Sequence, residues 1–404
     1  MIFIGIDWAR SKHDFTAIDT EGNVLTRGTV PHDAQGFMKL GATIASLEST
    51  PQEVHVGVEL HNGALLSWLL DQNYIVYAIN PKSANRARDR HRPSGAKDDK
   101  LDAFVLADMA RTDRNRLRPI RKDSAATREL RAWTRLRGRL VQQKTATSQR
   151  LRALLAEWAP RLSTLCDDFN RKWQRDLLEL TPLHDHLKGL HGNRINAFCH
   201  AHRLRSKTVS RIRDTRMHPA LVIPAGLHDA ICAEILGLVE SLNSLIARID
   251  QAETEIDSCI QNHPDAEIFQ SLPVKGTATV GTLLAAFGES REDAPHWRDL
   301  AACWGVAPVT VQSGKSRHVK RRRACDHTVN QALLFFSFKT AFTKGCWAQG
   351  YYQKKRDQGC DHYGTLRCLA QRWIKIIHRL WKDRILYSEQ LHQRNLKLRG
   401  AVAA

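Results

Sequence analysis

The sequence predicts an α/β domain followed by a long, mostly helical remainder. In the amino-terminal part, short apolar stretches alternate with helical ones, which favours a mixed sheet with helices packed on its faces. Further along the chain, apolar residues recur every three or four positions, as expected of helices. The length of 404 residues allows two to four domains with sizeable cores.

The amino-terminal part divides into predicted strands and helices in a definite order. Residues 2–7, 14–19 and 23–30 form an antiparallel meander, because Thr20-Glu21-Gly22 favours a turn between the last two. A helix around 33–48 follows. The remaining predicted elements are strands at 53–59 and 74–79 and a helix from about Asn62 to Leu70.

The middle and the end of the chain are predicted to be helical. Residues 111–152 carry 14 Lys or Arg and three acids, yet apolar residues keep a helical spacing, so they predict a long basic helix. Residues 183–227 have no clear period and receive no assignment. Short helices are expected around 265–345, and a last basic helix at 364–396. A heptad seam that predicts a coiled coil consists of Ile231, Ile235, Leu238, Leu242, Leu245, Ile249, Ala252 and Ile256.

These patterns give four expected regions, with boundaries at 1–118, 119–262, 263–345 and 346–404. Aromatic side chains could stack on unpaired bases, but most tryptophans lie at helical apolar positions, which is more typical of core residues. The tryptophans predicted to be in the core are Trp133, Trp158, Trp304, Trp373 and Trp381.

Composition indicates a folded protein with a polyanionic partner. Lys and Arg outnumber Asp and Glu by 61 to 42, which gives a formal charge of +19. The nine cysteines show no C-x-x-C pair, so we expect a reduced cytoplasmic protein without disulfides or a zinc ribbon. We expect neither secretion nor membrane insertion, because no stretch approaches about 18 uninterrupted apolar residues.

Four acids in the first part of the chain form the main candidate site. Asp7 and Glu59 each close an apolar strand, and Asp99 and Asp102 lie three apart on a predicted helix. Solvated strand ends and an acidic first helical turn are the structural alternatives. Taken together, the four carboxylates predict a site for Mg²⁺ or Mn²⁺ that supports phosphodiester chemistry.

A second candidate site is QSGKSRHVKRRRA at 312–324, where Ser313-Gly314 precedes a cationic run. Serine needs a base, a metal or nearby cations to act as a nucleophile, and an ordinary loop is the alternative. His318, Cys325 and His327 lack a fourth ligand, so zinc is not expected there. The residues predicted to bind nucleic acid are Arg131, Arg135, Arg139, Lys315, Arg317, Lys320, Arg321, Arg322 and Arg323.

Residues 272–288, LPVKGTATVGTLLAAFG, allow two interpretations. One is a turn that contacts a nucleic-acid backbone through main-chain amides, and the other is a helix start capped by Thr.

These motifs together resemble the transposases of the insertion-sequence one-ten family over nearly the whole chain. The stretches that carry the resemblance are GIDWARSKHDF, GVELHNGALLSWL, AKDDKLDAFVLA, LPVKGTATVGTLLAAFGE, LAACWGVAPVTVQSGKS and RRRACDHTVNQAL. The family's Pro-Gly-Ile-Gly turn appears here as Pro273-Val274-Lys275-Gly276, and its Lys-Arg-Gly step as Arg323-Ala324-Cys325. These departures concern DNA contact, since the four acids and the serine are present.

The resemblance implies a RuvC-like domain of ribonuclease H fold, in which Asp7, Glu59, Asp99 and Asp102 bind Mg²⁺. It also implies a transposase domain in which Ser313 forms a covalent phosphoserine with DNA. The implied partners are donor and target DNA and a structured bridge RNA that acts as guide. Family members assemble as dimers and tetramers on DNA, and the heptad seam gives a separate reason to expect a homodimer.

We therefore expect a DNA transposase or recombinase of the prokaryotic cytoplasm, associated with the nucleoid. One alternative is a junction-resolving nuclease that uses metal-activated water, and another is a non-catalytic RNA- or DNA-binding protein. An actin-like kinase is disfavoured, because Trp8-Ala9-Arg10 replaces the phosphate-binding turn that such enzymes need.

Overall fold

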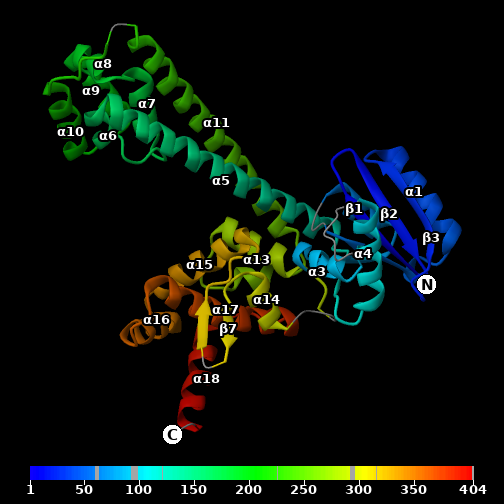
Figure 1. Ribbon diagram of the computed structural model, residues 1–404. Helices are drawn as coiled ribbons and strands as arrows, with labels where there is room; N and C mark the ends of the chain where they lie inside the picture. Colours follow the sequence, from blue (N-terminus) through cyan, green and yellow to red (C-terminus); the bar gives the residue numbers. More distant parts are fainter. Residues whose placement is uncertain are drawn as a thin grey trace. The chain divides into compact units, whose positions relative to one another are not determined.

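The computed structural model describes residues 1–59, 63–91, 99–120, 122–224, 226–291, 296–314 and 316–402. The chain divides into two compact units, Met1–Asp123 and Ser124–Ala404. The first is an α/β unit, and the second is almost entirely helical (Figure 1). The predicted fold class is confirmed at this level.

A mixed six-stranded sheet forms the centre of the first unit. The first three strands make the predicted antiparallel meander, with Gly22 in the left-handed region (φ +93°) in the turn between the second and third. The next two strands are parallel to the first, and the last is antiparallel to its neighbour. In the order β3-β2-β1-β4-β5-β6, the strands are β3 (Val24–Pro31), β2 (Lys12–Ile18), β1 (Ile2–Trp8), β4 (Val54–Val58), β5 (Ile75–Ala78) and β6 (Pro119–Ile120).

Helices cover both faces of this sheet. On one face Leu40 and Leu65 pack against Ile4 and neighbouring strand residues, and on the other Ala107 packs against Phe3. A short 3₁₀ helix, η1 (Pro51–Glu53), precedes β4. The helices are α1 (Ala34–Leu47) and α2 (Ala64–Asp71) on the first face, α4 (Asp99–Thr112) on the second, and α3 (Pro81–His91), which contacts α4.

Two long antiparallel helices, α5 (Ala125–Trp158) and α11 (His228–Gln261), connect the two cores of the second unit (Figure 1). The predicted basic helix at 111–152 is wrong at its start, because α4 ends at Thr112 and β6 intervenes. Ser124 caps α5 by accepting a hydrogen bond from the Thr127 amide at 3.2 Å. Arg137–Glu253 and Arg150–Glu234 ion pairs connect α5 to α11.

The heptad seam of α11 has its packing partner within the same chain. Of its members, Ile235, Leu242 and Ile256 are fully buried, and α5 is the main helix they face. These residues therefore do not supply the separate reason for a homodimer that the heptad pattern suggested. Among the described residues, α11 is also the one helix long and apolar enough to span a membrane, but its apolar face packs on α5.

A lobe of short helices packs where α5 ends and α11 begins. Its core combines Leu151 and Leu155 of α5 with Ile231 and Ile235 of α11. The stretch 183–227, which has no sequence period, forms three short helices packed on this core. The lobe consists of α6 (Pro160–Leu165), α7 (Lys172–Leu180), α8 (His184–Gly189), α9 (Gly192–Ala201) and α10 (Ser206–Met217).

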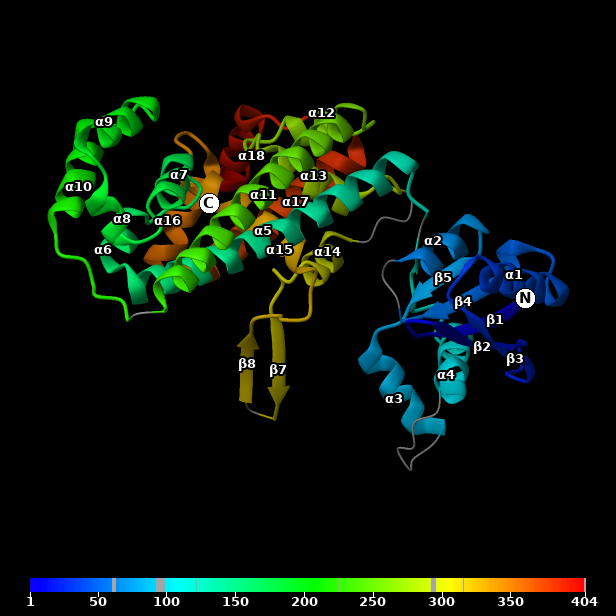
Figure 2. The ribbon, with the colours of Figure 1, turned by 90° about the horizontal axis from the view of Figure 1, so that it is seen from above.

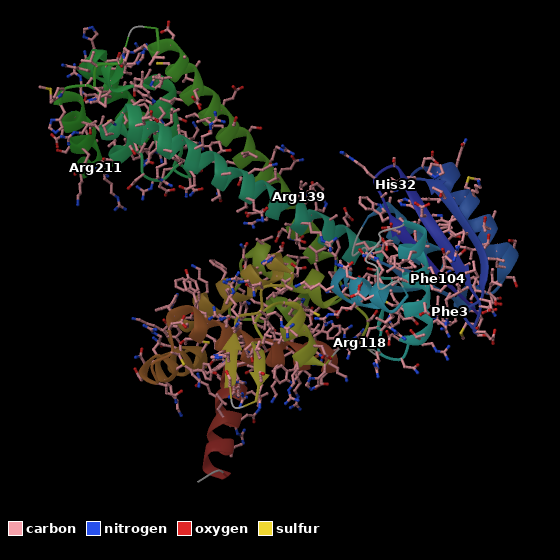
Figure 3. All side chains as sticks on the ribbon, in the orientation of Figure 1. Phe3, His32, Phe104, Arg118, Arg139 and Arg211 are labelled. Carbon is pink, nitrogen blue, oxygen red and sulfur yellow. The ribbon has the colours of Figure 1, made fainter. Side chains whose placement is uncertain are left out.

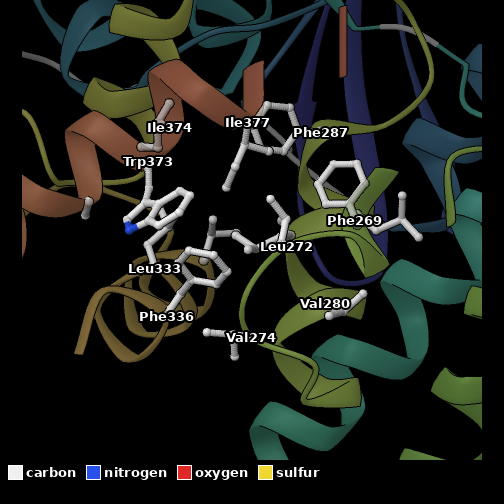
Figure 4. Packing of buried hydrophobic residues seen from close by; sticks show 14 of the residues in the cluster. Phe269, Leu272, Val274, Val280, Phe287, Leu333, Phe336, Trp373, Ile374 and Ile377 are labelled. Carbon is white, nitrogen blue, oxygen red and sulfur yellow. The ribbon is translucent and has the colours of Figure 1, made fainter. Parts of the chain in front are cut away.

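The other end of the pair, where α5 begins and α11 ends, packs into the main core of the second unit. Figure 4 shows residues of this core. Trp304, Trp373 and Trp381 are buried there as predicted, and Trp133 and Trp158 are partly buried against the two helical cores. The elements are α12 (Ala266–Gln270), α13 (Thr277–Phe287), α14 (Trp297–Cys303), β7 (Val309–Ser313), β8 (Ser316–Lys320), α15 (His327–Ala341), α16 (Trp347–Asp357), α17 (His362–Asp383) and α18 (Glu389–Val402).

Two details of this region differ from the sequence prediction. The expected single helix at 364–396 is broken at Arg384, which adopts a left-handed conformation (φ +53°) and ends α17. The expected run of short helices is interrupted by the hairpin of β7 and β8.

Candidate catalytic residues and nucleic-acid surface

A pair of glycines lets α4 lie directly on the sheet. Gly5 of β1 and Gly57 of β4 are opposite each other in the parallel register. A Cβ at Gly5 would lie 1.8 Å from the Ala103 carbonyl oxygen, and one at Gly57 2.4 Å from that of Leu106. Any side chain here would push the helix away, so the two glycines fix where α4 crosses the strands.

This crossing lies beside two of the predicted site residues. Asp7 is two positions after Gly5 in β1, so its side chain leaves the sheet on the face that α4 covers. Glu59 follows the last residue of β4, and continuing the Ile6–Val58 register puts it opposite Asp7. Neighbouring strands are about 4.8 Å apart, so the two half-buried acids are adjacent at the carboxyl ends of parallel strands.

The third acid comes from α4 itself. Asp102 directly precedes Ala103, whose carbonyl oxygen contacts Gly5, and it is only 7% exposed. Its Oδ1 accepts a hydrogen bond from Nε of Arg88 in α3 at 2.5 Å. Asp99 is the first residue of α4, one turn before Asp102, and its side chain lies outside the described residues.

The strand register and the crossing of α4 therefore put the backbone positions of Asp7, Glu59 and Asp102 near the same end of the sheet. Carboxylates that meet on a single face suit a hard divalent cation, and the mostly buried Asp102 has its charge balanced by Arg88. The sequence prediction did not include Arg88 or the glycine pair. Glycine inside a strand is a sequence signal of close backbone approach and could have identified the crossing point.

Ser313 lies at the tip of an exposed hairpin. It is the last residue of β7 and is paired with Ser316, the first residue of β8. Gly314 between them has φ +54°, a conformation that favours glycine and allows the tight turn. Figure 2 shows the two strands projecting away from the helices of the same unit, and most of their side chains are exposed.

Cations follow Ser313 along the hairpin and in the stretch after it. Arg317 faces Gln312 across the strands, Lys320 faces Val309, and both are exposed. Arg321 and Arg323 are exposed as well, whereas Arg322 is half-buried. Lys315 lies outside the described residues.

The three predicted arginines of α5 have different surroundings. Arg131 donates to the Ala285 carbonyl oxygen at 2.9 Å, so part of its guanidinium is engaged in the core. Burial, followed by the neighbouring charge of Arg131, lowers the pKa of Arg135. Arg139 is exposed (Figure 3) and is the one of the three best placed to meet phosphate.

The structure also describes two further sequence motifs. In the 272–288 stretch, α13 begins at Thr277 with Gly276 at the capping position and no side-chain cap, so the predicted helix start is confirmed and the Thr cap is wrong. The other motif is the group of His318, Cys325 and His327, in which Sγ of Cys325 and Nδ1 of His327 are 3.9 Å apart.

Comparison with known proteins places these features in a family. Residues 4–160 match a family model described as a transposase, and residues 266–353 match one for the IS116/IS110/IS902 transposase family. Together the matches cover nearly all of the first unit, including Asp7, Glu59 and Asp102, and the hairpin that carries Ser313.

Individual relatives align over nearly the whole chain. A Streptomyces coelicolor protein named as a candidate mini-circle transposase for IS117 is 28% identical over 96% of both chains. A 43.6 kDa protein of insertion element IS110 from the same organism is 25% identical over 96% of both. A 42 kDa protein of insertion element IS900 from Mycobacterium paratuberculosis is 26% identical, over 96% of this chain and 97% of the relative. The chain therefore belongs to the IS110, or insertion-sequence one-ten, family of transposases.

Proposed function

We propose that this protein is a DNA recombinase that moves its insertion sequence by cutting and rejoining donor and target DNA through a phosphoserine at Ser313. The observation that carries the proposal is the exposed position of Ser313 at the tip of a cationic hairpin, in a chain that also presents carboxylates at the end of a sheet. The serine and the acids belong to different compact units. Recombination would need both groups.

The acidic face would hold Mg²⁺, or Mn²⁺, through Asp7, Glu59, Asp99 and Asp102. A bound cation of this kind supplies charge stabilisation at the oxygen atoms of the scissile phosphate. We further propose that the first unit is a RuvC-like ribonuclease H fold. An antiparallel meander joined to parallel strands, with acids at the strand ends, supports this assignment.

The hairpin residues would perform the exchange itself. The Oγ of Ser313 gives up its proton and forms a bond to phosphorus, the bond from phosphorus to a sugar oxygen breaks, and that oxygen takes up a proton and leaves as a hydroxyl. A hydroxyl of the second DNA then attacks the same phosphorus and releases the serine. Arg317, Lys320 and Arg321 would hold the flanking phosphates, since charge-assisted hydrogen bonds to phosphate oxygens are the strong ones.

The remaining parts of the proposal concern partners and location. A net charge of +19 suits two nucleic acids, a DNA substrate and a structured bridge RNA as guide. We propose that the protein assembles as a dimer, then as a tetramer on DNA, and works on nucleoid DNA in a prokaryotic cytoplasm. Since the heptad seam is used within the chain, assembly would rely on other surfaces.

The test is a search for a protein–DNA adduct that survives denaturation. Purified protein is incubated with Mg²⁺, the noncoding RNA of its element and labelled donor and target DNA. We expect an adduct with the wild type, none with Ser313→Ala, and a retained adduct with Ser316→Ala, the matched control across the hairpin. Cleavage without an adduct in any of the three would favour a nuclease that uses metal-activated water. Unchanged activity in Asp7→Ala would contradict a role for the acidic face.

A further inference from the structure

A group of side chains of metal-binding types lies in the lobe of α6–α10 at one end of the α5–α11 pair, here called the distal lobe. Among the described residues, His186 of α8 and His228 and Cys232 of α11 offer ligand atoms that all lie within 4.8 Å of one another. His228 and Cys232 are one turn apart, and Nδ1 of His228 is 3.9 Å from Sγ of Cys232. Two ligands of a tetrahedral zinc ion, with bonds of about 2.0 and 2.3 Å, are about 3.5 Å apart.

The contacts of His228 prepare its ring for such an ion. Nε2 of His228 is 2.8 Å from Oδ2 of Asp185. Because an ionised carboxylate only accepts hydrogen bonds, Nε2 carries a hydrogen toward Asp185. A cation that binds at Nδ1 takes the place of any proton there, which otherwise faces Oδ1 of Asp229 at 3.3 Å. A carboxylate behind the far nitrogen is the usual companion of a metal-bound histidine.

His186 supplies a second observation. Its Nδ1 is shielded from solvent and makes no hydrogen bond, although Oδ1 of Asp185 lies 3.4 Å away. Its ring also lies against that of His228, with centroids 5.2 Å apart. One ring nitrogen of His186 lies within 4.8 Å of the ligand atoms of His228 and Cys232, so a cation bound there would engage this incompletely hydrogen-bonded ring.

We propose that His186, His228 and Cys232 bind Zn²⁺ and fasten α8 to the first turn of α11. Two imidazoles and one thiolate suit zinc better than hard cations such as Mg²⁺. The Asp229 side chain is fully exposed and is not part of this group, so a water molecule can take the fourth position. Binding replaces the thiol proton of Cys232, which passes to solvent.

The zinc site is a separate proposal from recombination, and its test uses metal binding instead of DNA chemistry. Tag-free full-length protein is titrated with Co²⁺ in excess Mg²⁺, so that the carboxylates of the first unit are occupied by the competing ion. We expect one Co²⁺ per chain, with visible bands typical of tetrahedral cobalt and a thiolate-to-cobalt absorbance in the near ultraviolet. Zn²⁺ should then displace the cobalt and remove both signals.

Variants identify the ligands. Cys232→Ser should remove the thiolate absorbance, and His228→Ala and His186→Gln should each weaken Zn²⁺ binding at least tenfold. Cys259→Ser, a partly buried thiol on the same helix, should bind as the wild type does. Zn²⁺ should also slow hydrogen exchange in α8 and the first turn of α11. The proposal is overturned if the wild type gives no thiolate absorbance, or if Cys232→Ser binds Zn²⁺ as tightly as the wild type.

Discussion

Replacing Arg88 by methionine tests whether Asp102 belongs to a cation site. The side chains of Arg88 and Asp102 are 19% and 9% exposed, and Nε of Arg88 lies 2.5 Å from Oδ1 of Asp102. Removing one partner of such a buried pair costs about 3 to 5 kcal/mol, because the other charge stays desolvated. Arg88 retains some contact with water, so we expect a loss near the lower limit, about 3 kcal/mol, when divalent cations are absent.

Mg²⁺ should restore most of that stability. A ligand present at about 100 times its Kd stabilises the native state by about 2.7 kcal/mol. The wild type should gain less, because Arg88 already balances the charge of Asp102. The measurement is native-state hydrogen exchange in the full-length protein, followed on peptides from β1 and α4, in chelator and in Mg²⁺.

The matched control is Arg111→Met on α4, the helix that carries Asp102. Nη2 of Arg111 is 2.7 Å from Oδ1 of Asp108, and the two side chains are 26% and 10% exposed. This variant should lose a similar amount of stability but gain nothing particular from Mg²⁺. The reasoning is refuted if Mg²⁺ rescues both variants equally, or if Arg88→Met is as stable as the wild type in chelator.

Three further predictions concern the hairpin, nucleic-acid binding and pH. Gly314→Ala places a Cβ at φ +54°, so we expect about 1 kcal/mol of local strain and slower adduct formation in a time course; a wild-type rate would contradict this. Arg317→Gln with Arg321→Gln should reduce the slope of log K against log salt by about 2, whereas Arg131→Gln, whose parent side chain bonds Ala285, should leave the slope unchanged. Burial, followed by the charge of His32, lowers the pKa of His13 from 6.5 to about 4. Below pH 6.5 the unfolded chain binds a proton that the native state excludes, so stability should fall by roughly 2–3 kcal/mol between pH 6.5 and 4. Urea unfolding of His13→Gln should show a smaller fall over the same range.

The parts of the fold that depend on local physics could be predicted from the sequence. The strands around Ile4 and Val56 have apolar patterns that need no distant information, and the turn at Gly22 follows from its residue types. The apolar tryptophan positions on the last long helix likewise indicated burial of Trp373. Each of these features is determined by residues that lie within a few positions of it in the sequence.

The remaining features depend on residues far apart in the chain. The heptad period of α11 specifies an apolar seam but does not state whether its partner is another chain or an earlier helix of the same chain. The Arg88–Asp102 pair requires two helices to meet. The β7–β8 hairpin was missed although Gly314 lies between two short stretches with β-branched residues, because its dense positive charge resembles a loop.

The α5–α11 pair has a consequence for the nucleic acids that the second unit can accept. Each helix has 34 residues and is therefore about 50 Å long. At about 3.4 Å per base pair, a duplex that touched both the main core and the distal lobe would extend over about 15 base pairs. The length of the α5–α11 pair would thus set the number of base pairs between the two contacts. Removing one heptad from each helix would shorten the span by about 10 Å, or three base pairs, while both cores kept their own contacts.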